Sequence, residues 1–220
     1  MSLKIVCVSD THCRLDEVTI PDGDLLVHAG DLTFQGTVKE ISRELTYLGK
    51  ATKRFKHGCI FVPGNHDWLF QTNMSLAKQM CEDYGITVLH HTSTQIEGLN
   101  IFGSAYTPAF MDWAFNKDRA ELKEVWDEIP DNTNILISHG PPMGILSTVR
   151  VVERGVEGID ECGCYDLYNR IQELKDLKLH IFGHIHDSYG TIDIGNITHI
   201  NASICTENYK PINKPIIIDL

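Results

Sequence analysis

Five short polar clusters in this chain combine aspartate, asparagine and histidine, the side chains that bind divalent metal ions. They are Asp10-Thr-His12, Gly30-Asp31, Gly64-Asn-His-Asp67, His139-Gly140 and Gly183-His-Ile-His186. Each cluster follows a short apolar run that favours a β-strand. Any one of them has a purely structural explanation, because aspartate and asparagine cap helices and turns, and a loop histidine can simply be solvated. The repetition of this pattern at five strand ends favours one shared site.

Parallel strands of an α/β sheet bring their carboxyl ends to the same edge, where ligands bind. We therefore expect the five clusters to meet and to hold two metal ions. The expected ligands of the first ion are Asp10, His12, Asp31 and His186. Those of the second are Asp31, Asn65, His139 and His184. Two ions roughly 3.5 to 4 Å apart and bridged by Asp31 can hold a hydroxide and clamp a phosphoryl group for in-line attack.

His66 is adjacent to the expected ligand Asn65 but is not needed as a ligand itself. An imidazole in this place suits a general acid that protonates the leaving oxygen. Asp67 is expected to orient the His66 ring or to stabilise its charged form. In isolation, His184 and His186 are as consistent with idle polar residues as with ligands, and only the other clusters favour ligation.

The elements that must position these clusters alternate between strands and helices along most of the chain. Expected strands cover residues 3–8, 25–28, 59–62, 86–89, 94–96, 100–102, 134–137, 177–182, 189–194, 197–201 and 215–219. Expected helices cover 37–48, 74–84, 118–129 and 164–175. Thr37-Val-Lys-Glu40 has the pattern of a capping box. Since no repeat or linker interrupts the pattern, one α/β domain over residues 1–220 is expected.

Composition restricts the function classes. The formal net charge of −11 repels phosphate backbones, so binding to long nucleic acid is not expected. No apolar run approaches the roughly 18 to 20 residues that span a bilayer, and no secretory signal is evident. The seven cysteines have irregular spacing, and we expect reduced thiols. These features favour a soluble cytoplasmic protein. The oligomeric state is left open.

The order DTH, GD, GNHD, SHG and GHIH between Asp10 and His186 resembles the calcineurin-like metallophosphoesterases. The resemblance implies a four-layer αββα sandwich, with two packed mixed β-sheets flanked by helices. It also implies a centre of two divalent metal ions and phosphoester hydrolysis. All seven expected ligands match the family pattern without substitution.

Gly103 to Asn116, the stretches SHGPPMGIL and HIFGHIHDSYG, and the C-terminal tail resemble the metallophosphoesterase-domain phosphodiesterases more narrowly. This resemblance implies hydrolysis of small phosphodiesters, cyclic nucleotides among them, with manganese; iron, zinc, nickel and magnesium are the alternatives. Some animal members have glycine at the position of His184, whereas this chain keeps the histidine. Two departures bear on the substrate: Tyr106 replaces an expected tryptophan, and the loop 149–164 is longer than expected.

On the substrate side, Tyr106 and Trp113 are expected to contact a nucleotide, with core packing as the alternative. Arg14 is expected to reach a phosphate oxygen, although a solvated surface arginine fits equally, and Arg150 and Arg154 share this ambiguity. The expected reaction is phosphodiester hydrolysis by metal-bound hydroxide with His66 as general acid. The alternatives are a phosphomonoesterase, a dinucleotide polyphosphate hydrolase, and a scaffold that has lost the chemistry.

Overall fold

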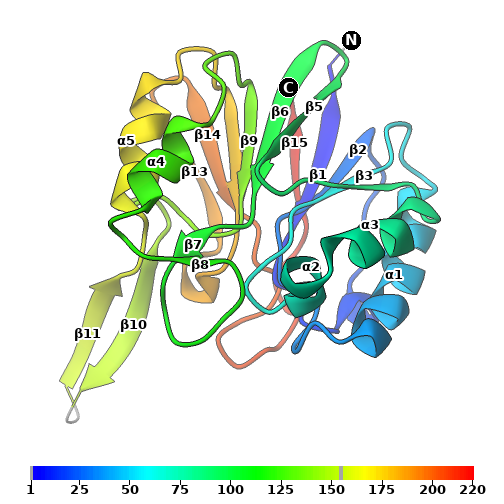
Figure 1. Cartoon of the computed structure of the whole chain (residues 1–220), viewed down its shortest axis with the longest axis horizontal. Coiled ribbons are helices and arrows are strands. Elements are labelled where there is room, and N and C mark those ends of the chain that lie inside the picture. The colour runs from blue at the N-terminus through cyan, green and yellow to red at the C-terminus, as the bar shows by residue number, and fades with distance from the viewer. Residues whose placement is uncertain (1, 154–155) are drawn as a thin grey trace.

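A computed structural model describes residues 2–153 and 156–220 and contains two mixed β-sheets (Figure 1). The first sheet has the strand order β15-β1-β2-β3-β4. Its members are β1 (Lys4–Val8), β2 (Leu25–His28), β3 (Cys59–Phe61), β4 (Ile86–Val88) and β15 (Ile216–Asp219). Strands β1 to β4 are parallel, and β15 pairs antiparallel to β1.

The second sheet has the strand order β13-β14-β12-β9-β6-β5. Its members are β5 (Thr92–Ile96), β6 (Leu99–Ser104), β9 (Ile135–Ser138), β12 (Leu179–Phe182), β13 (Gly190–Ile194) and β14 (Ile197–Asn201). The central strands β14, β12, β9 and β6 are parallel, and the two outer strands β13 and β5 run antiparallel to their neighbours. Both sheets are therefore mixed, as expected.

Helices cover the outer face of each sheet (Figure 1). On the first sheet lie α1 (Val38–Thr52), α2 (Trp68–Thr72) and α3 (Met74–Glu82), and on the second lie α4 (Leu122–Asp127) and α5 (Tyr165–Glu173). The described chain also has short elements, namely η1 (Leu15–Glu17), η2 (His186–Ser188), and the small strands β7 (Thr107–Pro108) and β8 (Asn116–Lys117). The layers run helix, sheet, sheet, helix, which confirms the four-layer expectation.

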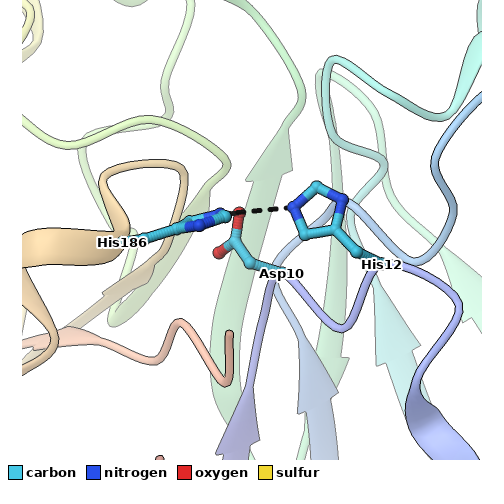
Figure 2. A group of neighbouring side chains, drawn as sticks. All are labelled: Asp10, His12 and His186. Carbon is cyan, nitrogen blue, oxygen red and sulfur yellow. Dashed lines mark hydrogen bonds and ion pairs between the residues drawn. The ribbon is translucent and has the colours of Figure 1, made fainter. Parts of the chain in front are cut away.

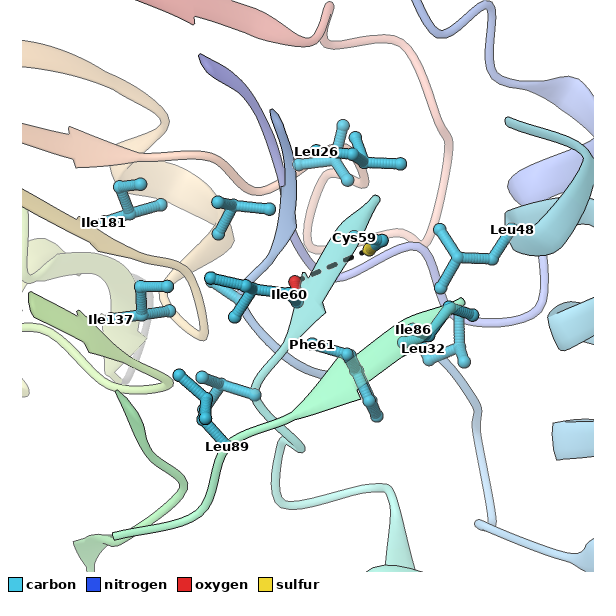
Figure 3. Close-up of a cluster of buried hydrophobic side chains, with 14 of the residues drawn as sticks. Leu26, Leu32, Leu48, Cys59, Ile60, Phe61, Ile86, Leu89, Ile137 and Ile181 are labelled. Carbon is cyan, nitrogen blue, oxygen red and sulfur yellow. Dashed lines mark hydrogen bonds between the residues drawn. The ribbon is translucent and has the colours of Figure 1, made fainter. Parts of the chain in front are cut away.

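Strand alternation builds one apolar core between the two sheets and further packing against the helices. Ile60 of β3 points toward Ile137 and Ile181 of the opposite sheet, whereas Cys59 lies on the side of Leu48 from α1 (Figure 3). On the outer side of the second sheet, a separate cluster packs α4 and α5 against the strands; it includes Phe102, Trp126, Leu136, Leu167 and Ile171. The sheets are thus fixed to each other near the strand ends that carry the polar clusters.

Local signals account for most of the longer elements, and α2 and a hairpin of two further strands are the main additions. The Thr37 side chain accepts from Glu40 N and the Glu40 carboxylate from Thr37 N, which confirms the capping box of α1. The sequence did not predict α2. Residues 149–164 were expected to form a loop. The structure instead has a hairpin of β10 (Thr148–Glu153) and β11 (Val156–Glu161) that projects from the body (Figure 1). No helix in the described part of the chain is long and apolar enough to cross a membrane.

Candidate dinuclear metal centre

The five polar clusters meet, but they come from two sheets rather than from one edge. Three follow β1, β2 and β3 of the first sheet, and two follow β9 and β12 of the second. Hydrogen bonds join the two groups: His139 Nδ1 lies 2.9 Å from Ala29 O, and His184 N donates to Asp10 Oδ2 at 2.9 Å. The expectation of a single sheet edge is therefore corrected, because the packing of two sheets brings their carboxyl ends together.

The backbone at these strand exits is strained. Asp10, His12, Asp31 and His184 adopt left-handed conformations with φ of 51°, 41°, 54° and 68°. Residues other than glycine seldom adopt positive φ, and each such position costs on the order of 1 to 3 kcal/mol. Four of the seven expected ligands share this strain. The surrounding structure therefore holds these four residues in backbone conformations that they would seldom adopt on their own.

Glycines allow the strand exits to approach each other closely. A Cβ added to Gly183 would collide with the carboxylate of Asp10 and with Ser9. A Cβ on Gly30, which itself has a φ of +110°, would collide with the imidazole of His139. The role of Gly183 is steric, because only a residue without a side chain leaves room for the Asp10 carboxylate.

The first group of candidate ligands is Asp10, His12 and His186, whose side chains point toward one another (Figure 2). His12 Nε2 lies 3.2 Å from His186 Nε2, and His186 Nε2 lies 3.3 Å from Asp10 Oδ1. Asp10 and His12 are fully buried. All three ligand atoms lie within 4.8 Å of one another, which is close enough for one ion.

The second group is Asp31, His139 and His184, with Asn65 beside it. His139 Nε2 lies 3.4 Å from Asp31 Oδ2 and 2.8 Å from Asn65 Oδ1. The same Asp31 oxygen lies 3.7 Å from His12 Nε2 of the first group. Asp31 therefore stands between the two groups, where a bridging carboxylate is expected.

Three of the imidazoles are held so that their lone pairs converge. The Nδ1 atoms of His12, His139 and His186 lie 3.3, 2.9 and 3.0 Å from backbone carbonyl oxygens of Thr33, Ala29 and Thr206. Because a carbonyl only accepts hydrogen bonds, each Nδ1 carries a proton, and in the neutral ring Nε2 is an acceptor. Unprotonated Nε2 atoms that face each other and carboxylates at 3.2 to 3.4 Å repel unless a cation, either a proton or a metal ion, lies between them. The donor set thus fits divalent metal ions, and the carbonyls fix the required tautomer.

Electrostatics agree with this fit. Burial alone would raise the pKa values of Asp10 and Asp31, but neighbouring histidines hold both below the usual range. Burial lowers the pKa values of His12 and His184 to about 4 each. Burial would also lower the pKa of His139, but the Asp31 carboxylate raises it to about 9. At neutral pH the site offers two carboxylates and two neutral imidazoles, and His139 would release a proton when a cation binds.

The structure places His66 in the site but gives Asp67 a different role from the expected one. His66 Nδ1 lies 2.7 Å from Phe34 O, so this carbonyl orients the ring. The Asp67 carboxylate accepts hydrogen bonds from the backbone of Leu32, Thr33 and Gly64 instead. The expectation that Asp67 orients the His66 ring is therefore wrong, and its alternative, that Asp67 stabilises the charged ring, stays a prediction. Asp67 instead ties together the two loops that carry Asp31 and Asn65.

A cavity of about 390 Å³ opens over the two groups. It is lined by His12, Asp31, Asn65, His66, Phe110, Met111, Trp113, Val149, Arg150, His184, Ile185, His186, Asp187, Glu207 and Tyr209. The Trp113 indole lies against the His66 imidazole, with ring centroids 4.0 Å apart at 33°. Asp10 and His139 are fully buried and are not among the residues that line the cavity. The site is thus accessible to a small substrate from one side.

Two of the expected substrate contacts lie outside this cavity. Tyr106 packs against both core clusters and His90, with ring centroids 4.7 Å apart. Arg14 forms an exposed ion pair with Glu17 at 2.9 Å. Among the expected contacts, Trp113 and the ambiguous Arg150 line the cavity, and Arg154 lies outside the described residues.

Sequence reasoning missed several supporting residues. Phe34 supplies the carbonyl behind His66 and packs against Tyr209, with ring centroids 5.0 Å apart. Tyr209 also packs edge-on against His12, at 4.9 Å. The Ser203 hydroxyl lies 2.9 Å from Asp10 Oδ2. Phe34 acts through its backbone carbonyl, and because every residue has one, the sequence cannot single it out. Tyr209 is far from the other site residues in the chain and reaches the site only through tertiary folding.

Comparison with known proteins decides the family. The model of the calcineurin-like phosphoesterases matches residues 3–188. The chain belongs to this family. Its enzymes hydrolyse phosphoesters with divalent metal ions, which agrees with the donor set described above. The human metallophosphoesterase domain-containing protein 1 is 37% identical over 239 residues, covering 99% of this chain and 71% of that protein. The narrower resemblance seen in the sequence is thereby confirmed.

Two further comparisons are more distant. A 3′,5′-cyclic-nucleotide phosphodiesterase of Nostoc is 26% identical over 186 residues, covering 80% of this chain and 60% of that protein. A solved crystal structure with 19% sequence identity has a TM-score of 0.62 and covers 91% of this chain and 90% of its own. At this identity the structural likeness shows the fold alone, and the fold agrees with the four layers described above.

Proposed function

We propose that this phosphoesterase is a dinuclear metal-dependent phosphodiesterase that acts on small phosphodiesters, with cyclic nucleotides (2′,3′ or 3′,5′) as the leading substrates. The main observation in support is the convergence of two carboxylates and four histidine side chains in two groups, some of whose members line one open cavity. In this proposal Asp10, His12, Asp31 and His186 hold one ion. Asp31, Asn65, His139 and His184 hold the second.

When bound, divalent ions at these positions supply a water of lowered pKa and neutralise charge that develops on the phosphoryl group. Manganese is the ion we propose first, because mixed imidazole, carboxylate and amide donors suit it. Iron, zinc, nickel and magnesium are the alternatives.

The chain itself contributes the proton for the leaving group. Since Nδ1 of His66 is directed to Phe34 O at 2.7 Å, its Nε2 is the atom free to act in the site, 4.0 Å from Asp31 Oδ2. A protonated ring in this position can give its Nε2 proton to the departing oxygen. The stacked indole of Trp113 restricts the ring to this orientation. The small exposed part of His66, 12% of the side chain, faces the cavity.

Substrate size supports small diesters over polymers. The cavity of about 390 Å³ is of the size that binds small molecules, and the net charge of −11 disfavours long nucleic acid. The name of the Nostoc relative supports cyclic nucleotides as the first compounds to assay. We also propose that residues 1–220 form one domain, because the main core cluster includes residues of both sheets. A cytoplasmic location is proposed because all seven cysteines are free.

The test is a substrate panel with the purified protein. Rates on bis(p-nitrophenyl) phosphate, p-nitrophenyl phosphate, and 2′,3′- and 3′,5′-cyclic nucleotides would be measured with each candidate metal after chelation. We expect manganese to restore activity and diesters to be hydrolysed faster than the monoester. A faster monoester would make the protein a phosphomonoesterase, and no turnover with any metal would favour a non-catalytic scaffold.

A further inference from the structure

The β10–β11 hairpin is attached to the segment that carries the candidate ligand His186. Thr148 N donates to Ser188 Oγ at 3.1 Å, and Ser188 Oγ donates to Thr148 O at 2.7 Å. Arg150 N donates to Asp187 Oδ2 at 2.9 Å. These three bonds join β10 to η2, directly after His186. The base of the hairpin is thus placed relative to the metal centre, although the rest of the hairpin projects from the body (Figure 1).

Arg150 brings a positive charge to the cavity from this base. Among the residues that line the cavity, it is the one whose side chain is always cationic. Arg150 also borders a second cavity of about 400 Å³ along the hairpin. An arginine in this place lies between the metal centre and the surface of the hairpin.

The guanidinium of Arg150 has no carboxylate partner among the residues whose side chains the structure describes. By contrast, four other arginines, namely Arg14, Arg43, Arg54 and Arg170, form ion pairs with nearby carboxylates. The Asp187 carboxylate, which is closest along the chain, accepts from the Arg150 backbone instead. A planar cation with five donors is therefore available to a ligand.

We infer that Arg150 forms an anion subsite for a second charged group of the substrate, apart from the phosphoryl group at the metal centre. This inference rests on the proposed function and makes its substrate class narrower: phosphodiesters in which one ester arm carries a further phosphate. Guanidinium and phosphate form strong bidentate hydrogen bonds, so the contact would affect both affinity and orientation. Simple diesters without the second phosphate would be hydrolysed without help from Arg150.

A matched pair of substrates isolates this contact. The p-nitrophenyl ester of thymidine 5′-phosphate and the same compound with an added 3′-phosphate share a scissile bond and a leaving group and differ only in the second phosphate. For Arg150→Gln we expect kcat/KM on the 3′-phosphorylated ester to fall about tenfold, since a hydrogen bond to a charged group contributes about that much. The ester without the 3′-phosphate should change less than twofold. Arg150→Lys should recover part of the loss.

Controls separate this inference from the proposed function. Arg119→Gln removes the same charge from an exposed position outside the cavity, and it should affect the two esters equally. If Arg150→Gln lowers both rates by the same factor, or lowers neither, the anion subsite is refuted while the diesterase function stands. If the wild-type protein hydrolyses neither ester with any metal, the proposed function fails first.

Discussion

The replacement Asp67→Asn tests how the two loops that carry the candidate ligands Asp31 and Asn65 are joined. Oδ2 of Asp67 accepts from Leu32 N at 3.2 Å and from Gly64 N at 2.9 Å. Oδ1 accepts from Thr33 N at 3.0 Å and from Thr33 Oγ1 at 2.7 Å. Four donors therefore converge on one fully buried carboxylate. An asparagine of the same shape would turn its NH2 group toward two of these donors and would lose the charge.

The expected cost follows from these contacts. Hydrogen bonds to a charged group contribute about 1.5 to 3 kcal/mol each, and a buried donor left without a partner adds a penalty. The isosteric amide keeps half of the contacts, and burial together with the Asp31 charge raises the pKa of Asp67 to about 6, which offsets part of the benefit of the carboxylate charge. We therefore expect a loss of about 3 kcal/mol in the free energy of unfolding, at the low end of what the lost contacts would cost. For a chain of this size, this corresponds to a fall of roughly 6 to 12 °C in Tm. Metal affinity should fall as well, because Asp31 and Asn65 lie on the two loops that separate.

The assay compares thermal unfolding of wild type, Asp67→Asn and the exposed-site control Asp176→Asn, each with chelator and with excess manganese. Turnover at saturating metal is measured in parallel. We expect the Tm of Asp67→Asn to fall in both conditions and its saturated turnover to change modestly. An unchanged Tm together with a loss of turnover as large as in a His66 variant would refute this reasoning. Asp67 would then act on His66, as the sequence alone indicated.

Two further predictions follow. His66→Gln should lower kcat about 100-fold for substrates with alkoxide leaving groups, and less for p-nitrophenolate, which needs no proton. The metal content, measured by mass spectrometry, should remain near the wild-type value. Loss of metal would instead identify His66 as a ligand. His180 is fully buried, and its burial holds the pKa well below the usual value. As pH falls, the imidazole of His180 is protonated in the unfolded state before it is protonated in the folded state. The contribution of neutral His180 to the free energy of unfolding is therefore complete above about pH 6.5 and is lost as pH falls. With chelator present, the free energy of unfolding of the wild type should therefore fall relative to that of His180→Gln by about 1.4 kcal/mol per pH unit below pH 6. A constant difference between pH 5 and pH 7 would contradict this.

Local patterns in the sequence predicted most elements of the fold. The run Leu25–His28 is apolar and bounded by polar residues, and it forms β2 with the same bounds. Thr37 and Glu40 satisfy each other's backbone, so the start of α1 needs no tertiary contact. The site also follows from pattern, because polar residues directly after buried strands must lie at the strand ends. The seven expected ligands therefore come together in the structure, although which of them bind metal remains a prediction.

What the sequence did not predict depends on contacts between distant segments. Asp67 is next to His66 in the chain, but its carboxylate is directed toward Leu32 and Thr33, which lie more than thirty positions away. Phe34 orients His66 through its backbone carbonyl, a group that every residue has, so the residue type gives no signal of this role. The hairpin had a signal that was missed: two valine-containing runs on either side of Gly155 are typical of paired strands.

The central claim is that this chain holds two metal ions bridged by Asp31. The most direct measurement is a crystal structure of the manganese-loaded protein with anomalous data collected at the manganese edge. We predict two peaks roughly 3.5 to 4 Å apart, one in each histidine–carboxylate group, with an Asp31 oxygen in contact with both. A single peak, or a peak coordinated by His66 in place of the second group, would contradict the claim.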